Sequence, residues 1–172
     1  MLDLRGYNEV YPVLPDEYFS QIPAGGYICK VVYINVTNSK AGNLMLVLYL
    51  DIAEGKFKNW FKEKVNNKKF DDVALEMNLW NNAGIYRQLI YDKTGKVSKF
   101  LKGLFVCFEK SNDNLVITEQ GFDENKLIGC KIGFVFTSKK YKKKNGESST
   151  WTSATFPKSV EDIYNNKYSI AL

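Results

Sequence analysis

Hydrophobic and polar residues alternate in two neighbouring segments of the chain. Between residues 27 and 36 apolar side chains recur at every second position, and a second alternating run extends from Leu44 to Ile52. A period of two is typical of a β-strand that buries one face. The polar segment 38–43 between the runs is short and glycine-containing, so it predicts a hairpin that joins two antiparallel strands.

The register of this hairpin follows from keeping the large apolar residues on one face, because a slip by one residue would invert a strand. The expected partners are Val36 with Leu46, Ile34 with Leu48, and Val32 with Leu50. On the opposite face, this register places Tyr33 against Tyr49.

A third strand is expected in one of two segments, 73–79 or 85–91, and the pattern does not choose between them. The apolar residues between Val97 and Phe108 then follow a period of 3.6, which predicts an amphipathic helix with Ser98 as its N-cap. This stripe consists of Val97, Phe100, Leu101, Leu104, Phe105 and Phe108.

Alternation returns at 132–136 and predicts a fourth strand, which leads into a run of lysines and then Asn145-Gly146. This dipeptide is a strong hairpin signal, so the chain is expected to return as a fifth strand through Trp151 to Phe156. Ser159 and Asp162 have the spacing of a capping box and predict a short final helix.

The order of these elements is three strands, a helix and two strands. It predicts a mainly β fold with one or two helices: a five-stranded, partly open OB-like barrel with the helix between strands 3 and 4. An open α+β sheet and a small sandwich are the alternatives. We divide the chain into an N-terminal arm (1–26), the OB-like domain (27–158) and a short C-terminal helix or tail (159–172).

Composition narrows the function classes. The chain has 172 residues, 45% of them hydrophobic and 25% charged, as is usual for a soluble globular protein, and we expect a cytoplasmic protein without a membrane segment. Its three scattered cysteines predict neither disulfides nor a zinc site. Histidine is absent, which removes the commonest general base and transition-metal ligand. We therefore expect no enzyme, no metal and no cofactor; a nuclease built on Asp71, Asp72 and Glu76 is the remote alternative.

The net charge is +5, and Arg5 and Arg87 are the chain's arginines, so lysine supplies nearly all the positive charge. Lysine meets phosphate as a mobile point charge, whereas arginine's planar fork reads guanine edges. If a nucleic acid is the partner, binding without sequence preference is favoured.

Three groups of residues are candidate nucleic-acid contacts. The first is the expected lysine-rich loop at the tip of the second hairpin: Lys139, Lys140, Tyr141, Lys142, Lys143 and Lys144. A two-residue turn would place Trp151 opposite Lys140, close to this tip. Lysines there could neutralise phosphates while the tyrosine stacks a base, although such a run also suits a solvated hairpin. The second group is the Tyr33 and Tyr49 pair with Lys40 nearby, which could equally be an ordinary cross-strand pair.

The third group lies in the segment 56–62, where lysines alternate with aromatic residues. Phe57 and Phe61 have the spacing of a pair that anchors a helix in the core, which leaves Lys58 and Trp60 as the candidate contacts.

The segment from Tyr27 to Gly55 resembles a family of small bacteriophage and prophage proteins, several of them regarded as OB-fold single-stranded DNA-binding proteins. Weaker similarity extends to Ile85–Leu89, Lys99–Gly103 and Leu127–Gly133. The resemblance implies a role in phage replication or recombination. The end of the chain, Asn166–Leu172, lacks the acidic tip with which cellular proteins of this kind recruit partners.

We therefore expect a non-enzymatic, sequence-independent single-stranded DNA-binding protein; the pattern does not distinguish DNA from RNA. The alternative is an OB-like accessory that binds a phage recombinase or replication protein and not DNA. Uncovered edge strands would also permit a homo-oligomer.

Overall fold

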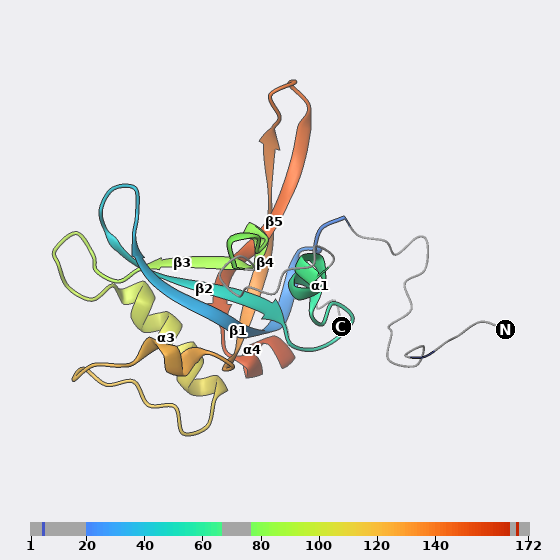
Figure 1. The fold of residues 1–172 in the computed structure, drawn as a ribbon. Helices are drawn as coiled ribbons and strands as arrows, with labels where there is room; N and C mark the ends of the chain where they lie inside the picture. The colour runs from blue at the N-terminus through green and yellow to red at the C-terminus, as the bar shows by residue number, and fades with distance from the viewer. Residues whose placement is uncertain (1–4, 6–19, 67–76, 166–167, 169–172) are drawn as a thin grey trace.

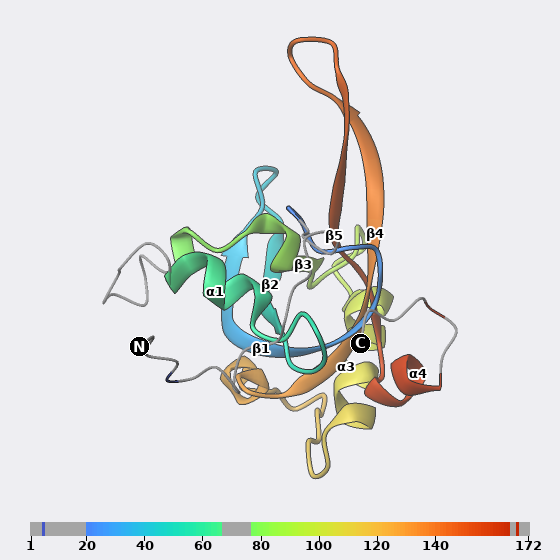
Figure 2. The same cartoon turned by 90° about the vertical axis from the view of Figure 1, so that its right-hand side faces the viewer.

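The five strands form one antiparallel sheet. The computed structural model describes residues 5, 20–66, 77–165 and 168. The strands are β1 (Gly25–Asn38), β2 (Leu44–Ile52), β3 (Ile85–Leu89), β4 (Lys131–Lys142) and β5 (Ser148–Lys158). They lie in the order β3-β2-β1-β4-β5. The edges β3 and β5 are not paired with each other, so the fold is an open OB-like barrel of mainly β structure (Figures 1 and 2).

The third strand is formed by Ile85–Leu89, one of the two segments that the sequence left open. It pairs with β2 so that Tyr86 lies opposite Leu48 and Gln88 opposite Leu46. Most of the competing segment, 73–76, lies outside the described residues.

The predicted β1–β2 register holds at the hairpin end and fails further along. Val36 pairs with Leu46, Ile34 with Leu48 and Tyr33 with Tyr49, as expected. The expected pairing of Val32 with Leu50 is wrong, because a β-bulge at this point brings Val31 opposite Leu50. The extra residue reverses the alternation, so that Val31 is buried and Val32 only half-buried.

The bulge lies where β1 changes partner. Residues 25–28 of β1 pair with β4 alone, Cys29 and Lys30 pair with both β4 and β2, and the later residues pair with β2. A bulge bends a strand and increases its twist, which allows one strand to serve both halves of the barrel. The bend is visible in Figure 2.

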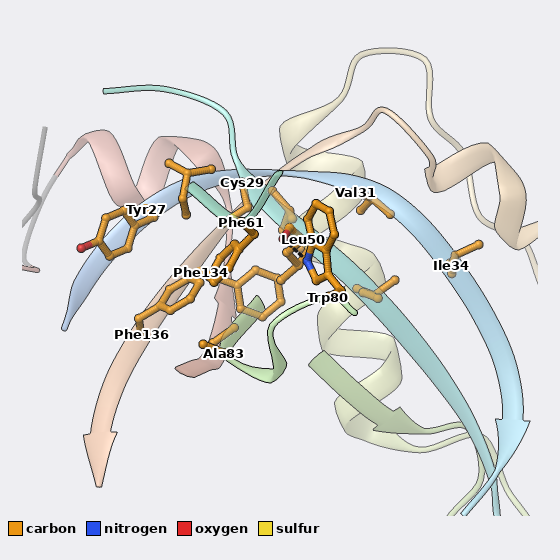
Figure 3. Packing of buried hydrophobic residues seen from close by; sticks show 14 of the residues in the cluster. Tyr27, Cys29, Val31, Ile34, Leu50, Phe61, Trp80, Ala83, Phe134 and Phe136 are labelled. Carbon is orange, nitrogen blue, oxygen red and sulfur yellow. Dashed lines mark hydrogen bonds between the residues drawn. The ribbon is translucent and has the colours of Figure 1, made fainter. Parts of the chain in front are cut away.

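The barrel interior is filled by aromatic and aliphatic side chains. Tyr27, Phe61, Phe134 and Phe136 converge there, and Phe61 stacks on Phe136 with ring centroids 6.3 Å apart (Figure 3). Trp80 is buried beside them and its indole N–H donates to the Leu50 carbonyl at 3.0 Å. The aromatic residues thus provide much of the apolar burial that holds the sheet curved.

A short 3-10 helix, η3 (Asn82–Gly84), contacts β5 on the side of the barrel where β3 and β5 are not hydrogen-bonded to each other. Gly84 is required there, because a Cβ at this position would lie 2.8 Å from the Phe61 ring and 2.9 Å from the Leu50 carbonyl. The open side of the barrel is therefore covered by η3.

The helices lie outside the sheet. They are α1 (Trp60–Asn66), α3 (Lys99–Ser111) and α4 (Val160–Tyr164), with a 3-10 turn η4 (Glu124–Leu127) before β4. Ser98 is the N-cap of α3, and Ser159 with Asp162 forms a capping box on α4, both as predicted. No helix in the described ranges has the length and apolar character of a membrane span.

The predicted stripe of α3 is only partly buried. Leu101, Leu104 and Phe108 face the core, whereas Val97 and Phe100 are 59% and 65% exposed. The core therefore covers only part of the apolar stripe, on the side of α3 that carries Leu101, Leu104 and Phe108.

Candidate nucleic-acid interface

The basic segment lies on a two-stranded hairpin that extends from the barrel. Residues 138–151, which comprise the outer ends of β4 and β5 and the turn between them, project well beyond the rest of the sheet (Figures 1 and 2). We call these residues the arm; they are distinct from the N-terminal segment 1–26. Lys139, Lys140, Tyr141 and Lys142 belong to β4, and only Lys143 and Lys144 lie in the turn. The expectation of a lysine-rich loop is therefore wrong for most of these residues, and as strand residues they point alternately to opposite sides.

The turn sets which residues face each other across the arm. The Lys143 amide donates to the Glu147 carbonyl at 2.8 Å and the Gly146 amide to the Lys143 carbonyl at 2.9 Å. Gly146 has a φ of 85°, which glycine adopts without strain. The loop thus contains three residues where two were expected, and Trp151 lies opposite Lys139 and not opposite Lys140.

This register divides the arm into two faces. Lys139 and Trp151 form one cross-strand pair and Tyr141 and Ser149 the next on the same side, because residues two apart share a face. We call this side, with Lys139, Tyr141 and Trp151, the aromatic face. Its tryptophan and tyrosine are 39% and 45% exposed.

The opposite side of the arm continues the face that carries Phe136 inside the barrel. There Lys140 pairs with Thr150 and Lys142 with Ser148. We call this side the hydroxyl face. It offers two ammonium groups and small hydroxyls but no ring, so it can hold phosphates and cannot stack bases.

The arm carries five lysines and a single acidic residue, Glu147. Lys143 lies 3.8 Å from the Glu147 carboxylate, and both side chains are exposed. Within the described part of the chain, no ion pair involves Lys139, Lys140, Lys142 or Lys144. Four positive charges on the arm are thus available to a polyanion.

The base of the arm is held by side-chain hydrogen bonds. The hydroxyls of Ser138 and Thr152 lie 2.6 Å apart. The side-chain amide of Gln21 donates to the Thr150 carbonyl at 2.9 Å and accepts from the Thr152 amide at 3.2 Å. The segment before β1 therefore satisfies two backbone hydrogen-bonding groups on the edge strand β5 and holds the base of the arm.

Tyr33 and Tyr49 meet across β1 and β2, as expected. Their ring centroids lie 5.4 Å apart in an edge-to-face arrangement, with Tyr33 36% exposed and Tyr49 half-buried. Each ring covers part of the other, so the pair contributes packing as well as a small exposed aromatic surface.

Lys40 is exposed in the β1–β2 turn, where Gly42 has a φ of 82°. This turn has the same three-residue form as that of the arm, since the Ser39 amide donates to the Asn43 carbonyl at 2.8 Å. In both views the tip of this hairpin and the arm project from the same side of the barrel (Figures 1 and 2).

Sequence reasoning did not select Arg87, an exposed residue on β3. It lies opposite Val47 and therefore on the same face of the sheet as Tyr49, and its guanidinium donates to the Asn82 side chain at 3.2 Å. Arg87 could be assigned to this face only if Ile85–Leu89 were known to be the third strand, and the sequence pattern left that strand open.

The structure does not bring Lys58 and Trp60 together as a binding pair. Trp60 is half-buried, packs edge-on against Phe57 with centroids 5.4 Å apart, and carries the Lys64 ammonium 4.5 Å from its ring centre. Phe57 and Phe61 are buried, which confirms their interpretation as core anchors. A ring that already holds a cation and a neighbour offers less surface to a base.

The buried carboxylate of Asp51 has a structural role. Burial raises its pKa, while backbone amides that donate to it oppose the rise. Its oxygens accept from the amides of Ile52 at 2.9 Å, Phe61 at 3.0 Å and Lys62 at 3.2 Å. Asp51 on β2 thus caps the first turn of α1 from a distance in sequence.

Among the described residues no group of three His, Cys, Asp or Glu side chains could hold a metal ion. The acidic residues of the remote nuclease alternative, Asp71, Asp72 and Glu76, lie outside those residues.

No protein-family model matches the chain, and no curated protein is significantly similar to it. The surface features that bear on function are the arm, the Tyr33 and Tyr49 pair, and the basic residues near them.

Proposed function

We propose that the protein binds single-stranded DNA without sequence preference and that the arm makes the principal contact. The observation that carries the proposal is the aromatic face, where Lys139, Tyr141 and Trp151 lie together on exposed strands. Lysine neutralises phosphates and releases counterions, and each ring can stack on an unpaired base.

The residue types favour a single strand over a duplex. A ring can stack on a base only where the base is not already stacked within a helix, and every base offers such a face. The arm contains no arginine, so no bidentate reading of base edges takes place there. Binding should accordingly depend on strand character and salt and little on sequence.

The β1–β2 side of the barrel extends this proposed interface. Tyr33, Lys40 and Arg87 are exposed there, and the hairpin that carries Lys40 projects from the same side as the arm. A strand held by the arm could continue over this surface, with Tyr49 supporting the Tyr33 ring from beside it.

The sequence resemblance suggests that this binding serves replication or recombination of a phage or prophage, in the cytoplasm and without a catalytic step of its own. A recombinase or replication protein would then act on the same strand.

The direct test is a titration with a labelled oligo-dT of about 30 nucleotides, with oligo-U and a duplex of equal length alongside. We expect tight binding to oligo-dT at low salt, a steep loss with added salt and weaker binding to the duplex. Stronger binding to oligo-U would identify RNA as the ligand. No binding at low salt would refute the proposal.

Trp151 provides a second readout. Trp151→Ala should weaken oligo-dT binding about 5- to 150-fold, equivalent to ~1–3 kcal/mol for one stacked base. Trp60→Phe is the matched control, because that ring is packed against Phe57 and Lys64. If both variants bind as the unmodified protein does, the aromatic face is not the contact.

A further inference from the structure

An apolar groove of about 480 Å³ opens between the far end of the sheet and α3. Val36 from β1 and Ile90, the residue after β3, line one side, and Leu101 and Phe105 of α3 also line it. Residues in the segment 117–124 form the remaining wall. No residue of the arm lines this groove, so it is separate from the arm.

Large apolar side chains at the mouth of the groove are exposed. Tyr91 and Val97 line the groove and pair with each other in an isolated β-bridge, and Val36 lines it from β1. Their side chains are 48%, 59% and 37% exposed, respectively. Contiguous exposed apolar residues around a recess are typical of an interaction surface.

The same side of the groove has a net positive charge. Lys102 lines the groove, and Lys93, Lys96 and Lys99 lie in the turn and first helical turn that border it. The turn also contains Asp92, whose carboxylate accepts from the amides of Thr94 and Lys96. In the described ranges these four lysines form no ion pair; the Lys99 ammonium lies 5.3 Å from the centre of the Phe100 ring. The first turn of α3 contains no acidic residue, so the positive end of the helix dipole adds to their field.

The opposite wall carries Glu119 and Glu124. The groove is therefore basic along α3 and acidic along the facing segment. A charged ligand would accordingly bind in one orientation, with its negative groups toward α3.

We propose that this groove binds a short acidic peptide segment of another protein. A bulky apolar side chain of the peptide fills the recess, and flanking carboxylates lie against Lys99, Lys102 and the lysines of the 92–96 turn. The recess is lined by aliphatic side chains and by the rings of Tyr91, Phe105 and Phe122. Phe105 and Phe122 already pack against each other with centroids 5.8 Å apart, which leaves a recess shaped for an apolar peptide side chain. The proposal does not depend on DNA binding by the arm.

The test is fluorescence anisotropy with a fluorescein-labelled peptide, Gly-Asp-Glu-Leu-Phe-Asp-Glu-Gly. We expect saturable binding that is lost when the two apolar residues of the peptide are replaced by serine. Lys99→Glu combined with Lys102→Glu should weaken binding about tenfold, because two exposed charge pairs become repulsive. Val97→Ser should weaken it as well, because Val97 lines the groove, and its 59% exposure leaves the fold intact.

The matched control is Lys140→Glu combined with Lys142→Glu on the arm, which changes the net charge equally. It should leave peptide binding unchanged and reduce oligo-dT binding, whereas the groove variants should do the opposite. Three outcomes would overturn the proposal: no peptide binding by the unmodified protein, equal binding by the groove variants, or loss of oligo-dT binding in the groove variants alone. A dimer in sedimentation that Val97→Ser dissociates would instead identify a second copy as the occupant.

Discussion

The salt dependence of oligo-dT binding should report how many arm lysines contact phosphates. Single-stranded nucleic acid gives a slope of log K against log salt of about −0.7 for each neutralised phosphate. Lys143 is paired with Glu147, so four arm lysines are available: Lys139, Lys140, Lys142 and Lys144. Replacing all four by glutamine should make the slope shallower by about 2.8, four contacts at about 0.7 each.

This change in slope corresponds to a large difference in measured affinity. Between 50 and 200 mM salt, a slope difference of about 2.8 means that the unmodified protein loses roughly 50-fold more affinity than the variant. Fluorescence titrations with oligo-dT at four or five salt concentrations measure both slopes directly. All four side chains are exposed, so the variant should unfold at an unchanged urea concentration.

The chain offers a control with the same change in net charge. Glutamine at Lys93, Lys96, Lys99 and Lys102 removes four exposed lysines beside α3 and leaves the arm intact. A general effect of net charge would flatten the slope equally in both variants, whereas phosphate contacts on the arm would flatten it only in the arm variant. Equal slopes in the arm variant and the unmodified protein would refute the assignment of the arm as the phosphate-binding element.

Three further predictions concern stability and are measured by urea unfolding. Asp51→Ala should lower the free energy of unfolding by about 3 kcal/mol, because buried amides that cap α1 lose their acceptor. Gly84→Ala should destabilise by about 1–3 kcal/mol, since its methyl would overlap the ring that fills the barrel, whereas Gly103→Ala meets nothing within 4 Å and should stabilise by up to about 1 kcal/mol. Hydrogen bonds from Lys131 and from the α4 tyrosine lower the pKa of Glu54, so its contribution is present above the unfolded pKa and is lost as pH falls through the folded value. Glu54→Gln should therefore flatten the fall in stability on acidification below about pH 4.5, and an unchanged pH profile would contradict this.

Local patterns were sufficient for the elements themselves. Alternation at 27–36 and 44–52 predicted β1 and β2, and the 3.6-residue stripe with Ser98 predicted α3. These features depend on which face of one segment is apolar and on which side chain can cap a helix, both of which neighbouring residues determine. The order of the elements then indicated the OB-like arrangement of the sheet.

The candidate site was predicted in its residues but not in its geometry. The sequence identified the lysines around Tyr141 and the tryptophan that follows, yet it placed them on a loop. A single additional residue in the turn changed the partner of Trp151 from Lys140 to Lys139. Turn length decides register, and register decides which side chains share a face, so this separation into an aromatic and a hydroxyl face required the structure.

The sequence by itself thus determined the strands, the main helix and the abundance of lysine, because each follows from local periodicity and composition. Only the tertiary structure decided the bulge between Val31 and Tyr33, the choice of Ile85–Leu89 as the third strand, and the capping of α1 by Asp51. Each of these joins segments that are distant in sequence or depends on how a whole sheet must bend. The physical reason is that burial and hydrogen bonding are satisfied for the assembled barrel, and no single segment contains the partners that satisfy them.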